Sequence, residues 1–322
     1  MRPAKRFPQP ATCGLCHETI LETYVPKMYH FEGKDYDLLR CRNCGNVQVW
    51  PMLDDRTVAR LYQSVDYYKT DYDSGVTSGS YAQNLKSILE RQSFALEILK
   101  KYHPKPGTLL EIGCAEGFFL ETVRNLGWRV QGVEIGRSAA AAARKRGLLV
   151  KNQSLQNCRF AARSFDAVYM GDVFEHLPNP TEYLQEIRRI LKRDGNLIVK
   201  CPHFLNSRVF RLIYGAAKSF KPFHKGKSRL LGLMKIPWHR PGPGRPYHLY
   251  EYNSRTLKSL MNSQGLEVVE IRNEVIRITF ADQFARGLPV VLLSGLFNAC
   301  RWACIIAGLP IGSTIAVVRM RQ

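Results

Sequence analysis

The chain has 322 residues, 45% of them hydrophobic, with nine cysteines and a formal net charge of +20. This length and apolar content suffice for a buried core and predict one medium-sized domain with a smaller one beside it. No apolar run follows the basic, proline-containing residues 1–12, which argues against an export signal and predicts a cytoplasmic protein. The odd number of cysteines then argues against a disulfide framework.

The positive charge is concentrated in one segment of the chain. No acidic residue lies between Asp194 and Glu251. Such a concentration predicts an anionic partner: nucleic acid, a phosphorylated substrate or an anionic membrane surface, with solubility alone as the alternative. The basic residues of this segment are Arg208, Arg211, Lys218, Lys221, Lys225, Lys227, Arg229, Lys235, Arg240 and Arg245.

Two Cys-x-x-Cys pairs near the N-terminus predict a metal site. Cys13 and Cys16 form the first pair, and Cys41 and Cys44 form the second. Each pair can hold one face of a tetrahedral ion, so the two pairs together predict a zinc site with four cysteine ligands. Four thiolates leave no open position, which predicts a structural role. Residues 1–50 are therefore predicted to form a zinc ribbon, with a β-hairpin between the two pairs.

The rest of the chain alternates between helical and strand patterns. Residues 51–105 are predicted to be a helical connector, because apolar residues in Ser87–Lys101 recur with a period near 3.6. From residue 108, strands alternate with helices, which predicts an α/β, Rossmann-like domain over 106–322, with a mostly parallel sheet and helices on both faces. Strands are expected at 108–112, 129–135, 165–171, 196–201, 266–271 and 314–320, and helices at 117–126, 136–147, 181–193 and 253–264.

The turn after the first of these strands is predicted to bind a ligand. Gly113 and Gly117 let the backbone approach a ligand, and the helix that follows offers free N–H groups. Glu134 ends the next strand, where a carboxylate can accept hydrogen bonds from ribose hydroxyls. Glu111 would repel phosphate groups, so the turn suits a cationic ligand better than a dinucleotide.

Four ordered motifs, LLEIGCAEGFFL, GVEI, FDAVYMGDVFEHLPNP and LKRDGNLIVKCP, resemble those of the class I S-adenosylmethionine-dependent methyltransferases. The resemblance covers residues 108–201 closely and 247–272 more loosely. It implies S-adenosylmethionine as cofactor, with the ribose on Glu134 and the adenine against Ile135. It also implies that Glu111, Gly113, Cys114 and Gly117 hold the methionine part, and that Met170, Gly171 and Asp172 pass beside the cofactor.

Glu175 and His176 are the candidate catalytic pair. They follow the strand 165–171 directly, and ligands of open α/β sheets lie outside the carboxyl ends of the strands. A histidine has a suitable pKa to remove a proton from a methyl acceptor. Alternatively, His176 caps the next helix or only lines the cofactor site. His248 is a second candidate base near the acceptor, or else a plain turn residue, and His203 is a third.

The EHLPNP form resembles quinone-type methyltransferases and deoxysugar C-methyltransferases, and in the latter a Glu-His pair at this point is implicated in base catalysis. The N-terminal cysteine pattern and the YDLLRCRNCGNVQVWP segment also resemble zinc-ribbon methyltransferases connected with sugars and surface polysaccharides. In these proteins the metal module helps to close over the acceptor. The tyrosines in the matching segment, predicted to line the site or to pack between domains, are Tyr62, Tyr67, Tyr68 and Tyr72.

Two insertions depart from a minimal methyltransferase. The first, 203–246, combines basic and aromatic residues, which suits a nucleic-acid surface or a membrane interface. Its place after the fifth strand is where the resembling families build an acceptor lid. The second, 274–313, is long and apolar enough to raise the question of a membrane span. Its helix 284–308 is expected to dock on a membrane surface, to mediate self-association as a homodimer or to pack internally.

Three functions remain open at this point. The first is methyl transfer to a small-molecule acceptor that carries phosphate, such as a nucleotide sugar or a surface-glycan precursor. The second is methylation of RNA, which the charge would suit, although the segment GDVFEH replaces the Pro-Pro-aromatic loop common in base-amino methyltransferases. The third is a non-catalytic binding protein with a decayed methyltransferase domain, against which the intact Glu111, Gly113, Gly117 and Glu134 argue.

Overall fold

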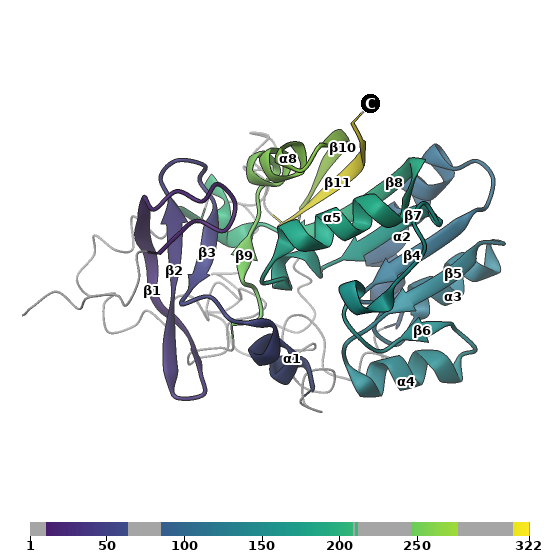
Figure 1. Cartoon of the computed structure of the whole chain (residues 1–322), viewed down its shortest axis with the longest axis horizontal. Helices are drawn as coiled ribbons and strands as arrows, with labels where there is room; N and C mark the ends of the chain where they lie inside the picture. The colour runs from purple at the N-terminus through teal and green to yellow at the C-terminus, as the bar shows by residue number, and fades with distance from the viewer. Residues whose placement is uncertain (1–10, 64–84, 209, 212–245, 276–311, 322) are drawn as a thin grey trace, which may run out of the picture.

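The computed structural model describes residues 11–63, 85–208, 210–211, 246–275 and 312–321 (Figure 1). Tyr67, Tyr68 and Tyr72, and most of both predicted insertions, lie outside these residues. Membrane docking and self-association of 284–308 therefore stay predictions. Within the described ranges, no helix is both long and apolar enough to cross a membrane.

The larger of two sheets has seven strands in the order β10-β11-β8-β7-β4-β5-β6. The five strands from β8 to β6 run parallel, whereas β11 is antiparallel to both of its neighbours. The predicted α/β fold with a mostly parallel sheet is confirmed. The strands are β4 (Thr108–Ile112), β5 (Arg129–Val133), β6 (Val150–Lys151), β7 (Phe165–Gly171), β8 (Leu191–Pro202), β10 (Leu266–Val275) and β11 (Gly312–Met320).

Helices cover both faces of this sheet because successive strand residues point to opposite sides. Leu109 and Ala167 pack with α2 (Leu85–Tyr102), α3 (Phe118–Asn125) and α4 (Arg137–Lys145) on one face. Their neighbours Leu110 and Val168 pack with α5 (Pro180–Ile190) and α8 (Ser254–Ser263) on the other (Figure 1). Both faces are buried, as expected for parallel strands.

The strand order reverses direction at β4. The chain leaves β4 toward β5 and β6 on one side, and it returns to β7 and β8 on the other. At such a reversal the connections diverge and leave room for a ligand beyond the carboxyl ends of the strands. Gly113, Glu134 and Asp172 each follow the carboxyl end of one of the three strands β4, β5 and β7.

The smaller sheet contains the predicted zinc ribbon. β1 (Leu21–Phe31) and β2 (Lys34–Cys41) form the predicted hairpin, and β3 (Val47–Trp50) pairs with β2. The fourth strand, β9 (Tyr250–Glu251), comes from the C-terminal part of the chain and pairs with β3. The ribbon shares one hydrophobic core with a face of the larger sheet, since Leu38 and Val47 belong to the same cluster as Leu110. The helix α1 (Asp55–Gln63) follows the ribbon.

Several predicted boundaries differ from the structure. The helix expected at 181–193 ends at Ile190, because Leu191 already pairs with Phe165 in the sheet. The strand expected at 129–135 ends at Val133, because the Glu134 side chain turns back to accept backbone N–H groups. β10 continues to Val275 and β11 begins at Gly312. The ends of both strands therefore lie inside the segment 274–313 that was predicted as the second insertion.

Candidate active site

The four cysteines of the ribbon meet in one cluster. The Sγ atoms of Cys13 and Cys44 are 3.6 Å apart, as are those of Cys16 and Cys41. All four sulfur atoms lie within 4.8 Å of one another. Tetrahedral zinc with bonds of about 2.3 Å would separate its sulfur ligands by about 3.8 Å. The donor set and its spacing therefore fit a closed zinc site.

The glycine-rich turn requires both of its predicted glycines. Gly113 and Gly117 have φ values of +73° and +81°, in the left-handed region that favours glycine. A Cβ atom on Gly113 would lie 2.3 Å from Val173, and one on Gly117 would lie 2.3 Å from Leu148. The close contact with Val173 places the turn beside the segment that carries Glu175 and His176.

Glu134 fastens this turn to the end of β5. Its Oε2 accepts a hydrogen bond from the N–H of Ala115 at 2.9 Å, and its Oε1 accepts one from the N–H of Gly136 at 2.6 Å. Each carboxylate oxygen has a second lone pair, so the carboxylate retains the capacity to accept ribose hydroxyls. Asn152 donates to the carbonyl oxygens of Glu134 and Ile135, which fixes the backbone beside the predicted adenine site.

Glu111 is a buried acid with an incomplete set of hydrogen bonds. Its Oε2 is buried without a hydrogen-bond partner. Burial raises the pKa of Glu111 well above its usual range, and the nearby Glu134 carboxylate adds to the effect. A buried carboxyl of this kind gains stability from a cationic ligand, because the ligand supplies both a donor and a compensating charge.

Four further residues implied by the resemblance lie at the carboxyl-end edge of the sheet, and their surroundings differ. The Cys114 thiol is buried against Gly132, and the Met170 side chain is fully buried in the core under α5. These two residues therefore offer a cofactor their backbone and not their side chains. Gly171 has no room for a side chain, because a Cβ atom would lie 2.2 Å from the Tyr169 hydroxyl. Asp172 then leaves β7 with a φ of +55°.

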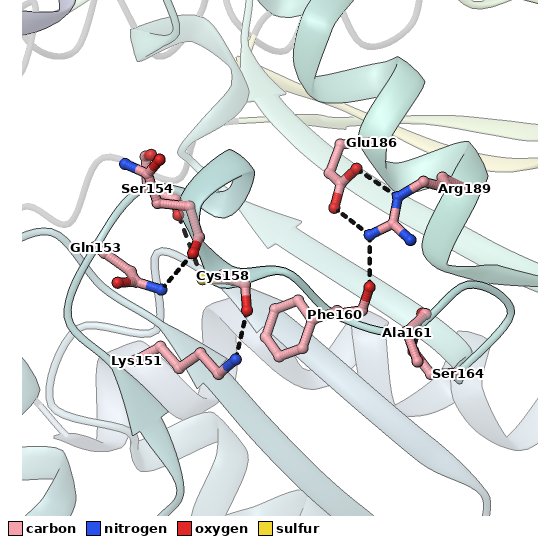
Figure 2. A network of polar contacts seen from close by, with 10 residues as sticks. Lys151, Gln153, Ser154, Cys158, Phe160, Ala161, Ser164, Glu186 and Arg189 are labelled. Carbon is pink, nitrogen blue, oxygen red and sulfur yellow. Dashed lines mark hydrogen bonds and ion pairs between the residues drawn. The ribbon is translucent and has the colours of Figure 1, made fainter.

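The loop after β6 is held in place by several polar contacts (Figure 2). Lys151 donates to the carbonyl oxygen of Cys158, and its ammonium lies 4.4 Å from the centre of the Phe160 ring. Arg189 of α5 donates to the carbonyl oxygen of Phe160 and pairs with Glu186. These contacts tie the loop to the sheet and to α5, so it forms a fixed wall next to Asn152.

Glu175, His176 and His248 come together, although 72 residues separate the two histidines. One ligand-type atom from each lies within 4.8 Å of the others. The Nε2 atom of His176 is 3.6 Å from Oε1 of Glu175, and the two imidazole rings are 4.9 Å apart between centres. Both oxygens of Glu175 are buried, and the Cys201 thiol is a neighbouring weak donor. The cluster lies at the carboxyl end of β7, where the sequence predicted chemistry.

Both histidines are held in the neutral form. Burial, reinforced by His248, lowers the pKa of His176 to about 3. Burial lowers the pKa of His248 to about 4. Nδ1 of His176 lies 2.7 Å from the carbonyl oxygen of Tyr247, so we assign the proton to Nδ1 and the lone pair to Nε2. In the neutral form the ring can then accept a proton at Nε2.

Glu251 is a site residue that the sequence analysis did not identify. Its Oε1 lies 3.2 Å from Nδ1 of His248, and burial raises the pKa of Glu251 to about 8. The signal was an acid three residues after a candidate histidine in the segment YHLYEY. Tyr62 also reaches the cluster, with its ring 5.7 Å from that of His176. His203 lies elsewhere and contacts Thr314 at 3.1 Å.

Comparison with known proteins shows which family the chain belongs to. The profile of a family described as "Methyltransferase domain" matches residues 81–271, more than half of the chain. The chain belongs to this family. It is therefore a class I S-adenosylmethionine-dependent methyltransferase by descent, and the predicted resemblance is confirmed.

Individual relatives are distant. A ubiquinone biosynthesis O-methyltransferase of Glaesserella parasuis serovar 5 is 28% identical over 129 residues, which are 37% of this methyltransferase and 55% of the relative. The chain spans about half the length of the curated relatives it matches.

Two solved structures share the fold. Magnesium protoporphyrin IX methyltransferase from Synechocystis PCC 6803 with bound S-adenosylhomocysteine has a TM-score of 0.50 at 14% identity, covering 84% of this chain and 100% of its own. Burkholderia thailandensis 1,6-didemethyltoxoflavin-N1-methyltransferase has the same score and identity, covering 93% and 100%.

Proposed function

We propose that this methyltransferase moves the methyl group of S-adenosylmethionine to a small-molecule acceptor, with His176 as the general base. One observation carries the proposal. A neutral imidazole with an unprotonated Nε2 lies beside the buried carboxyl of Glu175, at the carboxyl end of β7 and next to the glycine turn. A base is useful only for an acceptor that loses a proton, so the proposed acceptor atom is a hydroxyl or an acidic C–H or N–H group.

The turn around Gly113 and the acids Glu111 and Glu134 would hold the cofactor. The buried Oε2 of Glu111 suits the ammonium end, and Glu134 suits the ribose, as argued above from their burial and hydrogen bonds. Bound there, the sulfonium supplies an electrophilic methyl group and leaves as a neutral thioether. The chain's own contribution is alignment of the acceptor atom with that methyl group and removal of a proton.

The proton goes to Nε2 of His176. As the acceptor atom bonds to the methyl carbon, its own proton passes to this nitrogen, and the imidazole becomes an imidazolium. Burial disfavours the positive charge on His176, and the Asp172 carboxylate offsets part of that effect, since it raises the pKa of His176. Tyr247 keeps the ring in place through its carbonyl oxygen.

The acceptor is proposed to carry phosphate, as in a nucleotide sugar or a surface-glycan precursor. The guanidinium group of Arg211 lies near those of Arg208 and of Arg40 in strand β2 of the ribbon. Burial, followed by Arg40 and Arg208, lowers the pKa of Arg211. A bound anion would lower the electrostatic repulsion within such a group of cations. The remaining basic residues of the predicted lid, 212–245, lie outside the described residues.

Methyl transfer from tritiated S-adenosylmethionine tests the proposal. The zinc-loaded protein would be incubated with nucleotide sugars, lipid-linked sugars, a ubiquinone precursor and total RNA, one class at a time. We expect label in one small-molecule class, lost in His176→Gln and retained in the exposed control His30→Gln. Label in RNA alone would replace the proposed acceptor class. An acceptor methylated equally fast by His176→Gln would remove His176 as the base.

A further inference from the structure

Strand β9 connects the zinc ribbon to the catalytic cluster. It pairs antiparallel with β3, with Gln48 opposite Tyr250 and Val47 opposite Glu251. The N–H of Val49 also donates to the carbonyl oxygen of Leu249 at 2.9 Å. His248 therefore lies two residues before β9, the fourth strand of the ribbon's own sheet, which Figure 1 shows beside β3.

Residues 247–250 also contact the other two members of the cluster, Glu175 and His176. The N–H of Leu249 donates to the carbonyl oxygen of Glu175 at 2.9 Å. The carbonyl oxygen of Tyr247 accepts from Nδ1 of His176, and the Tyr250 hydroxyl donates to the carbonyl oxygen of Pro178. Residues 247–250 thus fix both ends of the Glu175–His176 turn. A shift of β9 would move all three members of the cluster.

Asn206 joins the second cysteine pair directly to this strand. Its Nδ2 donates to the carbonyl oxygen of Gly45 at 3.2 Å and to that of Glu251 at 2.8 Å. Gly45 follows Cys44 immediately, and the Glu251 side chain contacts His248 at 3.2 Å. Asn206 is 2% exposed, and the amide nitrogen uses both of its hydrogens in these bonds.

The first cysteine pair also touches β9. A Cβ atom on Gly14, between Cys13 and Cys16, would lie 2.2 Å from the Tyr250 hydroxyl. Gln48 of β3 accepts from the N–H of Gly14 at 2.8 Å and donates to the carbonyl oxygen of Thr12 at 3.0 Å. Both metal-binding turns are therefore packed or hydrogen-bonded against the strand that carries the catalytic segment.

The metal would hold these two turns together. No disulfide joins the four cysteines, so no covalent bond links the two turns that carry them. In small zinc modules the binding free energy of the metal is the folding free energy, because the ligands converge only in the folded state. Loss of the metal would separate the two turns, and β9 would lose its packing against Gly14 and its bridge through Asn206 to Gly45.

We propose that metal binding at the four cysteines positions His248, His176 and Glu175 through β9, with Asn206 as the positioning residue between them. The catalytic meaning of this coupling rests on the proposed function. The coupling itself is a property of the chain and is measurable without an acceptor. The zinc ribbon would then be part of the active-site structure and not an independent appendage.

Hydrogen–deuterium exchange of the full-length protein, zinc-loaded and zinc-stripped, tests the coupling without any substitution. We expect amides of residues 249–251 to exchange at least about tenfold faster without zinc, together with those of the ribbon strands. Amides of β4 and β7 should keep their protection. Unchanged exchange at 249–251 would overturn the proposal. Loss of protection throughout β4 and β7 would also overturn it, because the metal would then support the whole fold and not the site through β9.

Asn206→Ala tests the positioning residue, with the exposed Asn262→Ala as the matched control. Long-range ¹H–¹⁵N spectra of the histidine rings, assigned with His248→Gln and His176→Gln, report the two imidazoles. We expect Asn206→Ala to shift both ring signals while zinc content and S-adenosylmethionine affinity stay as in the wild type. Unmoved signals in zinc-loaded Asn206→Ala would contradict the role of Asn206. Absence of cofactor binding in the wild type would instead contradict the proposed function and leave this test intact.

Discussion

Nδ1 of His176 lies 2.7 Å from the carbonyl oxygen of Tyr247, a residue 71 positions further along the chain. A carbonyl oxygen only accepts hydrogen bonds, so this contact favours the proton on Nδ1 and leaves Nε2 as the proposed base. Tyr247 immediately precedes His248, and the same short segment therefore sets the tautomer of one histidine and supplies the other. The chemistry proposed for this methyltransferase follows from that arrangement.

Replacement of His176 by Gln is expected to slow methyl transfer by about 10²- to 10⁴-fold, because a positioned general base contributes an acceleration of this order. Affinity for S-adenosylmethionine should stay within about twofold, since the proposed cofactor contacts are Glu111, Glu134 and the turn around Gly113, and not His176. Initial rates with the identified acceptor and calorimetry with the cofactor measure the two effects. A variant that loses affinity and rate equally would place His176 in the cofactor site.

Acid is expected to destabilise the protein through its two buried histidines. The pKa values of His176 and His248 are lowered to about 3 and about 4, below the roughly 6.5 of an unfolded chain. The unfolded state therefore binds more protons between these values, so the stabilisation is full above about pH 6.5 and is lost as pH falls toward 4.

The unfolding temperature should accordingly fall more steeply between pH 6.5 and 4 in the wild type than in His176→Gln. Glu251 is expected to change the stability in the opposite direction with pH. Its pKa is raised to about 8, so its contribution is full below about pH 4.5 and is lost as pH rises through 8. Thermal melts across pH 4–9 separate the two trends. Equal slopes in wild type and variant at acid pH would show that His176 is not held neutral.

Two glycines with nearly the same φ angle offer a matched test of the turn around Gly113, the proposed cofactor site. Gly113 and Gly33 have φ values of +73° and +74°, but a Cβ atom on Gly113 would meet Val173 at 2.3 Å, whereas Gly33 has no atom within 4 Å. Gly33→Ala should cost about 1 kcal/mol of stability from backbone strain alone. Gly113→Ala should cost more and also weaken S-adenosylmethionine binding. Denaturant unfolding and calorimetry check both, and equal behaviour of the two variants would contradict the assigned close approach.

Cys44→Ser is expected to release the metal and to lower the unfolding temperature. Structural zinc contributes to folding directly, so its loss removes stability rather than chemistry alone. Cys158→Ser is the control, because Cys158 is buried but bonds to Ser154 outside the cluster. Metal analysis should find one equivalent of zinc in the wild type and in Cys158→Ser, and none in Cys44→Ser. Zinc retained at full occupancy in Cys44→Ser would remove Cys44 from the ligand set.

Much of the fold was predictable because it depends on local patterns. The strands after residue 108 alternate with helices, and each strand is an apolar run between turn residues, so the parallel sheet follows from the sequence. Boundaries were less predictable. Leu191 extends the apolar pattern of α5, but its pairing with Phe165 across the sheet places it in β8. Sequence periodicity carries no information on such a non-local pairing.

Part of the candidate site was also predictable from local sequence patterns. Glu175 and His176 stand out because they follow a strand, and the cysteine pairs stand out by their spacing. β9 has only two residues and gives no periodic signal, and Asn206 is one asparagine in a segment of no clear pattern. Their roles depend on the packing of the ribbon against the larger sheet, which only the folded structure shows.

Binding of S-adenosylmethionine is best measured by calorimetric titration of the zinc-loaded protein, with Glu134→Ala as the comparison. We expect micromolar binding by the wild type and loss of binding in the variant, because Glu134 fastens the turn at Ala115 and is proposed to accept the ribose hydroxyls. A folded, zinc-loaded wild type that binds no S-adenosylmethionine would overturn the proposed function and limit the methyltransferase relationship to ancestry.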